Sequence, residues 1–411
     1  MPRGATVKIR PALGAGVLVL AFAAAAQPVP AKPANARIDA LLRDAVADHG
    51  VKAAIVQVTA GGERVMTRAY GESQDGEPAT PRMRFRNGTV ATAHMATLLL
   101  RLADRGRVDL DDKVAKWLPD LPGGRRVTLR MLAGMSAGYH DYAIDPRTTE
   151  QRYAQPFRAI STARKLELAL DPPREFPAGS NFSFSHSDYV ILGRALEEIT
   201  GLPLDVALRR MVLRPLGLRQ TVASQTASIP RPALHAFSAE RRAFLGVPRG
   251  TVFLEDVTAW NPAWMLARGA VQTSSIRDLT RTAIGVGEGR LLSRRAHRRQ
   301  VDGRRGFGHP RPGCARCTRL GGRFGYGLGV ERNGAWIMER SMQGGYAVIG
   351  SYLPAKRISV ALVLTLRSSA FDALGNPRPY WTGLHARIGK ALAPGNAPLR
   401  RPAALLARTG G

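Results

Sequence analysis

Residues with high strand propensity lie near both ends of this chain, and a long helical region separates them. Val51 to Thr59 is a β-branched run, and the Gly61-Gly62 pair indicates a turn into a second strand near residues 64–69. Strand character returns far along the chain, between Gly344 and Leu366. We therefore predict an α+β layer whose sheet is built from two distant chain segments.

The region between the strands predicts helices. From Thr89 onward, methionine and leucine side chains recur at helical spacing until Gly106, a typical helix stop. Helical runs broken by Pro and Gly continue to about residue 290, and further helices are expected over 37–49 and around 380–392. Residues 27–36 are rich in Pro, Ala and Lys without an apolar period, so they predict a linker.

The first 26 residues have the three parts of a secretory signal peptide. Arg3, Lys8 and Arg10 form a basic start, residues 12–26 are apolar and uncharged, and Ala24-Ala25-Ala26 fits a small-residue cleavage site. No later segment reaches about 18 uninterrupted apolar residues, which a membrane-spanning helix needs. We therefore expect an exported protein, periplasmic or extracellular, with no transmembrane anchor after processing.

The charge balance is strongly basic, because 60 Lys and Arg face 31 Asp and Glu, a net charge of +29. Three of these charges would leave with the signal peptide. Such a balance points to a polyanionic partner, but an exported protein meets little nucleic acid. We therefore expect no nucleic-acid partner and consider an anionic surface of the cell envelope instead.

Ten of the arginines lie between residues 294 and 323, against the single acid Asp302. One interpretation is a solvated insertion without further function. The other is a patch that grips phosphate or carboxylate groups of an anionic surface through guanidinium forks. Few aromatic residues accompany the arginines, so the stacking groups of a nucleic-acid site are missing.

The two cysteines, Cys314 and Cys317, favour a local disulfide in an oxidising compartment. Three alternatives stay open: a redox centre, a pair of free thiols, and a zinc site completed by His297 and His309. The redox centre would need a strand–helix context, and the zinc spacing matches no common finger. We expect neither a metal nor another cofactor.

Short motifs occur along the chain in a recurring order, and together they resemble one family. It is the serine β-lactamase and penicillin-binding family, particularly its class C, D-alanyl-D-alanine carboxypeptidase and esterase branch. The resemblance implies an antiparallel sheet flanked by helices, plus a helical lobe, with the site in the cleft between them. The resemblance covers residues 38–392. We expect one domain over 37–393, with a sheet lobe from about 37–84 and 323–393, a helical lobe of about 85–290 and the basic loop 294–323. A basic tail is expected to follow over 394–411. The motifs are Phe85–Thr92, Asp109–Asp112, Trp117–Pro119, Thr128–Leu132, Phe176–Gly179, Phe182–His186, Gln272–Ser275 and Tyr326–Gly329.

The residues that carry the chemistry of this family are replaced. Its acyl transfer uses Ser-x-x-Lys, with the serine as nucleophile and the lysine as base. Thr89 falls on the serine and Thr92, which has no basic nitrogen, on the lysine. In the Tyr-x-Asn motif, Phe184 replaces the tyrosine and cannot transfer a proton, and His186 replaces the asparagine. The Lys/His-x-Gly motif maps to Glu339-Arg340-Ser341.

These substitutions predict a catalytically impaired or inactive relative. Thr89 precedes a helix and predicts an N-cap, a role that can coexist with a place in the site. An oxyanion hole made of backbone N–H groups tolerates side-chain change, and the resemblance implies Thr89 N–H and Met342 N–H as its donors. The cleft would then hold a small peptide, an ester or a cell-wall fragment, and peptidoglycan-like peptides are one candidate.

Two other functions stay open. His186 is expected near Thr89, so a neutral imidazole could serve as base for the threonine hydroxyl, with Glu339 as a conceivable orienting group. The protein would then be an active ester or amide hydrolase. Alternatively, the basic loop 294–323 rather than the cleft carries the function, as a module that binds an envelope polyanion.

Overall fold

The computed structural model describes residues 31–224, 226–304 and 306–399. The expected signal peptide, residues 1–26, and most of the basic tail lie outside the described residues. None of the helices in the described part combines the length and the apolar character that crossing a bilayer requires.

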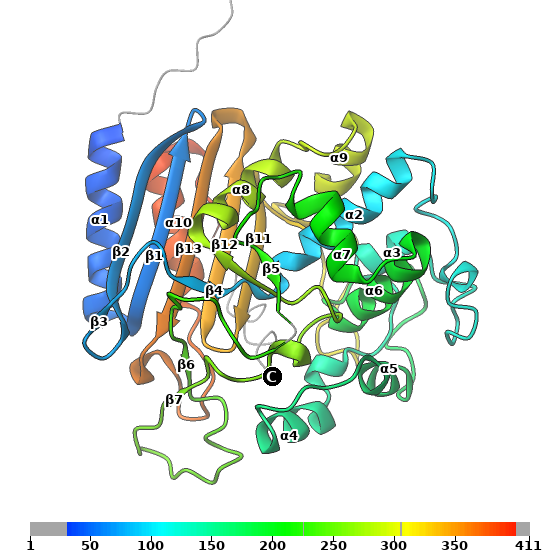
Figure 1. Ribbon diagram of the computed structural model, residues 1–411, viewed down its shortest axis with the longest axis horizontal. Helices are drawn as coiled ribbons and strands as arrows, with labels where there is room; N and C mark the ends of the chain where they lie inside the picture. The colour runs from blue at the N-terminus through cyan, green and yellow to red at the C-terminus, as the bar shows by residue number, and fades with distance from the viewer. Residues whose placement is uncertain (1–30, 225, 305, 400–411) are drawn as a thin grey trace, which may run out of the picture.

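The described residues form one eight-stranded sheet in the order β3-β2-β1-β13-β12-β11-β10-β9 (Figure 1). Strands from the start and the end of the chain meet where β1 pairs antiparallel with β13, for example Val56 opposite Leu362. Every paired neighbour in the sheet is antiparallel, so the predicted antiparallel sheet built from two distant segments is confirmed. The strands are β1 (Val51–Ala60), β2 (Glu63–Gln74), β3 (Glu77–Pro78), β9 (Phe324–Tyr326), β10 (Glu331–Asn333), β11 (Trp336–Gln343), β12 (Tyr346–Leu353) and β13 (Ile358–Leu366).

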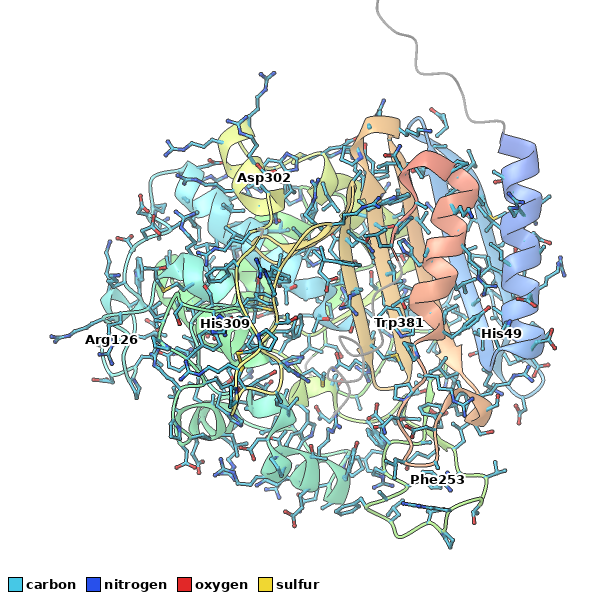
Figure 2. All side chains as sticks on the ribbon, turned by 180° about the vertical axis from the view of Figure 1, so that it is seen from behind. His49, Arg126, Phe253, Asp302, His309 and Trp381 are labelled. Carbon is cyan, nitrogen blue, oxygen red and sulfur yellow. A yellow bond between two sulfur atoms is a disulfide. The ribbon has the colours of Figure 1, made fainter. Side chains whose placement is uncertain are left out.

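Helices cover both faces of the sheet. α1 (Ala31–Asp48) and α10 (Tyr380–Leu392) lie over one face, as Figure 2 shows from behind, and α8 (Ile276–Gly287) packs on the other. Every residue of β12 and β13 is buried as a result, which explains their near-continuous apolar sequence. The linker expected over 27–36 is wrong for residues 31–36, because they form the first turns of α1. Ala34 is buried there, and the Asn35 side-chain amide donates to the Val65 carbonyl at 3.0 Å.

The central region forms a helical lobe beside the sheet (Figure 1). Its core joins α2 to α6 through side chains such as Met95, Leu99, Leu192 and Leu196. Short strands also occur: β4 (Arg84–Arg86), β8 (Gln272–Ser275) and β5 (Val222–Ala223) form one small sheet, and β6 (Phe237–Ser238) and β7 (Glu255–Asp256) form a pair below the main sheet in Figure 1. The helices of the lobe are α2 (Ala91–Asp104), α3 (Leu129–Ala133), α4 (Pro146–Ala154), α5 (Thr162–Leu170), α6 (His186–Thr200) and α7 (Leu204–Leu208).

The basic segment 294–323 begins with α9 (Arg294–Val301), whose N-cap is the Ser293 hydroxyl. The following loop crosses the helical lobe, between the labelled Asp302 and His309 and beyond (Figure 2). Leu320 and both cysteines are buried in it. The expectation of a purely solvated insertion is therefore wrong for this loop, because its apolar side chains pack on the lobe while several arginines stay outside.

Candidate functional site

Thr89 lies in a single 3-10 turn, η1 (Gly88–Val90), between β4 and α2. The turn packs directly against β11. Gly88 has a φ of +52°, and a Cβ added there would lie 2.0 Å from the Ser341 hydroxyl oxygen. Only glycine fits between the turn and the strand, so this close approach determines where Thr89 sits.

Both polar groups of Thr89 are bound to β11. Its hydroxyl donates to the Arg340 carbonyl at 2.8 Å, and its backbone N–H donates to the Ser341 hydroxyl oxygen at 3.2 Å. The predicted N-cap is wrong: α2 starts after Val90, without a capping side chain in the described residues. The Arg340 carbonyl can accept from Thr89 because β10 pairs only with residues 336–338 of β11 and leaves residue 340 uncovered.

Thr92 occupies the first turn of α2 and is buried. Its hydroxyl lies 2.8 Å from the Thr89 carbonyl oxygen and 3.1 Å from the Gly329 carbonyl oxygen. Both neighbours are acceptors, so the Thr92 hydroxyl is used as a donor to the backbone. Thr92 therefore provides no general base for the hydroxyl of Thr89.

Phe184 and His186 lie at the start of α6. The Ser185 hydroxyl caps the helix by accepting from the Asp188 N–H at 3.1 Å, which directs His186 inward. The two rings make an edge-to-face contact with their centroids 5.4 Å apart. Both side chains line the same cleft as Thr89.

The group that orients His186 is Asp141, which the sequence did not suggest. The His186 Nδ1 lies 3.1 Å from Asp141 Oδ2, and the His186 backbone N–H donates to Oδ1 of the same carboxylate at 3.1 Å. Asp141 is only 1% exposed, and its Oδ2 also accepts from Arg316 Nη1 at 2.5 Å. Burial acts to raise the pKa of Asp141, but His186 and Arg316 together hold it well below its usual range.

Glu339 does not orient His186, so that part of the alternative hypothesis is wrong. Its side chain does not line the cleft; its Oε2 lies beside Gly350 of β12, at the point where Leu279 of α8 packs against that strand. Neither carboxylate oxygen has a hydrogen-bond partner among the described residues. Burial raises the pKa of Glu339 to about 8, so the carboxyl is largely neutral at pH 7.

The next residues of β11 do reach the cleft. Arg340 donates through Nε to Glu331, whose two carboxylate oxygens lie 2.9 Å away, and both side chains are nearly buried. Ser341 and Met342 follow along the same wall. Of the four residues expected to bind substrate, three therefore line the cleft and Glu339 does not.

The cleft has a volume of about 430 Å³ and a mostly apolar wall. Its size suits a small peptide-like molecule. Charged groups stand at several points of the wall, and Arg152 and Glu240 face each other there with 3.7 Å between Nη2 and Oε2. Besides the residues already described, the lining includes Tyr153, Phe182, Met265, Leu320, Phe324, Tyr326 and Gln343.

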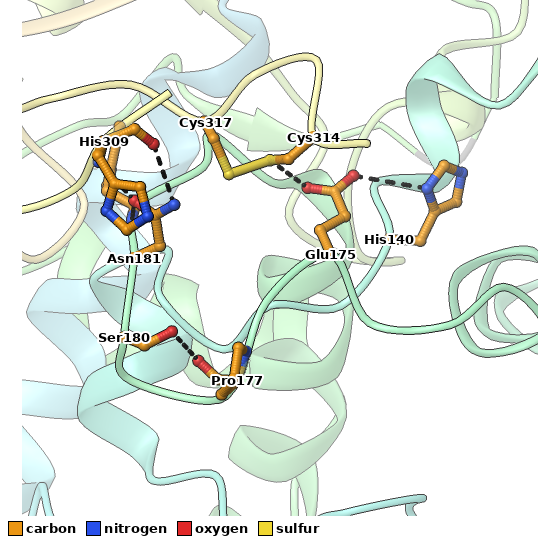
Figure 3. Close-up of a disulfide and its surroundings, with 9 residues drawn as sticks. His140, Glu175, Pro177, Ser180, Asn181, His309, Cys314 and Cys317 are labelled. Atoms are coloured by element: carbon orange, nitrogen blue, oxygen red, sulfur yellow. Dashed lines mark hydrogen bonds and ion pairs between the residues drawn. A yellow bond between two sulfur atoms is a disulfide. The ribbon is translucent and has the colours of Figure 1, made fainter. Parts of the chain in front are cut away.

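Cys314 and Cys317 form a disulfide beside the cleft (Figure 3). Among the described residues, the carboxylate beside the two sulfurs belongs to Glu175, whose Oε2 lies 3.0 Å from Cys314 Sγ. The other oxygen of this carboxylate, Oε1, lies 3.5 Å from His140 Nδ1. The histidines considered for zinc are not part of this cluster; the backbone of His309 is bonded to Asn181 instead. Sulfurs joined in a disulfide offer no thiolate ligands, so the oxidised pair does not make a zinc site.

The sequence matches the family described as Beta-lactamase over residues 38–381. A Salmonella typhimurium protein, provisionally named a D-alanyl-D-alanine carboxypeptidase, is 32% identical over 129 residues; the match spans 30% of this chain and 30% of that relative.

Similar solved structures cover far more of the chain. A D-stereospecific amidohydrolase from Streptomyces is 25% identical over 88% of this chain and 99% of its own, with a TM-score of 0.71. The D-amino acid amidase of Ochrobactrum anthropi, in complex with L-phenylalanine, is 19% identical over 88% of this chain and 100% of its own, with a TM-score of 0.73. At that identity the second likeness shows the fold.

Proposed function

The chain belongs to the beta-lactamase family, and we propose that this member binds small peptide-like ligands in its cleft without hydrolysing them. The family is one of serine hydrolases, and the fold and the cleft of this member follow it. The proposal concerns what the cleft does with a ligand once it is bound.

One observation carries the proposal: both polar groups of Thr89 are already engaged by β11. An oxyanion hole needs its N–H donors free and aimed at the developing charge. Here the Thr89 N–H is already hydrogen-bonded to the Ser341 hydroxyl oxygen. The hydroxyl proton points at the Arg340 carbonyl, which is no base.

The missing base supports the same conclusion. General acid–base help contributes about 10²–10⁴-fold to a rate, and Thr92 supplies none of it. No lysine within the described residues lines the cleft. Lys165 is buried but donates to the Leu266 carbonyl.

The ligand class follows from the size of the cleft and from the relatives. The names of the similar proteins refer to D-alanyl-D-alanine, to D-stereospecific hydrolysis and to D-amino acids. We propose that peptides with a D-residue, of the kind found in the cell wall, are the ligands here, with export as part of the same proposal. Phe182, Phe184 and Met265 offer apolar contacts to such side chains.

The test combines a covalent probe with a binding measurement on the purified chain. We expect no stable label from a fluorescent penicillin and no turnover of a chromogenic ester. Calorimetric titration with a D-alanyl-D-alanine peptide is expected to show binding, which persists in Thr89→Ala. Covalent labelling that disappears in Thr89→Ala would refute the proposal.

A second candidate, hydrolysis with His186 as base, is favoured by its contact with Asp141. A carboxylate on Nδ1 orients an imidazole so that Nε2 can take a proton from a hydroxyl or a water. His186 and Thr89 line one cleft, although no hydrogen bond joins them. Ester turnover that is lost in both His186→Gln and Asp141→Asn would establish this function in place of the first.

A further inference from the structure

The disulfide separates the cleft from a small polar cluster behind it. Both cysteines are buried, 4% and 2% exposed, and they pack against Phe176. Cys317 lines the cleft, whereas Cys314 does not and instead contacts Glu175 (Figure 3). The two cysteines therefore face different surroundings, and a molecule in the cleft meets Cys317 before Cys314.

Arg316, between the two cysteines, connects the disulfide to His186. Its side chain is 4% exposed, and its Nη1 is bound to the same Asp141 oxygen that holds His186 Nδ1. Closing the short Cys314–Cys317 turn restricts the backbone from which this arginine extends. The position of His186 thus depends on Asp141, and Asp141 on an arginine held by the disulfide.

The rest of the loop is attached to the segment that precedes α6. Cys317 forms a β-bridge with Ser183, and the Thr318 N–H donates to the Phe182 carbonyl at 3.3 Å. On the other side, the Asn181 side chain exchanges two hydrogen bonds with the His309 backbone, at 3.0 and 2.8 Å. Breaking the disulfide would leave these attachments in place, so the change would be confined to the turn that carries Arg316.

We propose that Cys317 is a thiol-exchange site for small thiols that enter the cleft, and that the disulfide is a redox-sensitive clasp which positions Arg316. In the first step the thiolate of the small molecule attacks Cys317 Sγ, the S–S bond breaks, and Cys314 leaves as a thiolate. In the second step another small thiolate attacks the mixed disulfide and releases Cys317. Two small thiols are oxidised to their disulfide, and the two cysteines gain two electrons and two protons.

Glu175 supports the reduced form. A disulfide sulfur has no hydrogen to donate, so the 3.0 Å contact between Cys314 Sγ and Glu175 Oε2 becomes a hydrogen bond only after reduction. A hydrogen bond to Glu175 in turn raises the pKa of His140.

The route to the disulfide, through the cleft, limits the reaction to small thiols. Both sulfurs are buried, so a thiol on the surface of another protein cannot reach them without opening the loop. The cleft of about 430 Å³ admits a tripeptide-sized thiol. This inference does not depend on whether the cleft binds or hydrolyses its ligand.

The first experiment locates the exchange in the full oxidised chain. Incubation with glutathione under native conditions, followed by intact mass and peptide mapping, is expected to give one adduct, on Cys317. In Cys314→Ser the remaining Cys317 thiol should react at least tenfold faster with a small maleimide than with a polymer-linked one. In Cys317→Ser the buried Cys314 should react slowly with both, and circular dichroism checks that the two variants fold. An adduct on Cys314, or reaction only after denaturation, would overturn the proposal.

The second experiment tests the positioning role through the Nδ1–H proton of His186, which a carboxylate hydrogen bond shifts downfield in an NMR spectrum. We expect the signal in the oxidised protein and its loss on reduction with dithiothreitol. Arg316→Met should lose it even when oxidised, and Arg316→Lys should restore it in part. Arg311→Met is the matched control, because Arg311 is an exposed arginine of the same loop and does not line the cleft. A signal unchanged by reduction and by Arg316→Met would refute the proposal that the disulfide positions Arg316 and, through Asp141, His186.

Discussion

Replacing Glu339 by glutamine should stabilise the protein increasingly as the pH rises. The carboxyl is 3% exposed, and neither of its oxygens has a hydrogen-bond partner among the described residues. Burial raises its pKa from 4.5 to about 8. Below pH 4.5 the group is protonated in the folded and the unfolded chain alike, so it costs nothing. Above that pH the unfolded chain ionises first, and the folded state loses stability until the pH passes about 8.

The size of the effect follows from that shift. Each pH unit between the two pKa values is worth about 1.4 kcal/mol of unfolding free energy. The penalty on the wild-type protein is therefore about 2 kcal/mol at pH 6 and approaches about 5 kcal/mol above pH 8. Glutamine has nearly the same shape and does not ionise, so the variant escapes the penalty. Its own buried amide adds a cost that does not change with pH.

The assay is urea unfolding of the wild type and Glu339→Gln at several pH values from 4 to 9. The difference between the two chains removes the contribution of all other titrating groups. Glu331→Gln is the matched control, since it removes a carboxylate that pairs with Arg340 and should destabilise. A difference between wild type and Glu339→Gln that stays constant from pH 4 to 9 would refute the reasoning.

Three further predictions concern the cleft and the basic helix. Asp141→Ala should lower the unfolding free energy by about 3–5 kcal/mol in chemical denaturation, because it leaves Arg316 buried without that carboxylate; an effect below 1 kcal/mol would contradict the network. Ser341→Gly should free the Thr89 N–H and tighten binding of a boronic acid, which mimics a tetrahedral intermediate; unchanged affinity would show that the N–H is not an available donor. Replacing the four arginines of α9 by glutamine should weaken retention on anionic vesicles at low salt but not at high salt, and equal retention would remove α9 as a surface for anions.

Much of the fold was accessible from local patterns. The β-branched run at Val51 and the apolar run after Gly344 are strands because each can be buried on both faces. The sequence of each strand does not show which strand it pairs with. Two apolar strand regions in one domain nevertheless bury the most apolar surface when they join the same sheet. The helix boundary at the N-terminus was missed because α1 extends to Ala31 through contacts with β2, such as Asn35 to Val65.

For the candidate site, residue identity shows which chemical groups are missing, whereas only the fold shows which groups meet. That position 92 has no amine and position 184 no hydroxyl is a property of residue identity, and no packing can restore those groups. Asp141 stands 45 residues before His186, and no spacing rule connects them. Likewise, nothing near Thr89 in the sequence indicates that its N–H would meet Ser341.

Covalent composition determined which chemical groups this protein possesses, and so which steps of the family reaction it lacks. Packing decided which of the remaining groups meet: Thr89 meets β11, His186 meets Asp141, and Arg316 reaches the same Asp141 from a disulfide turn. The reason is physical. A side chain carries its donors and acceptors wherever it lies, whereas a hydrogen bond between distant residues exists only where the folded backbone brings them within about 3 Å of each other.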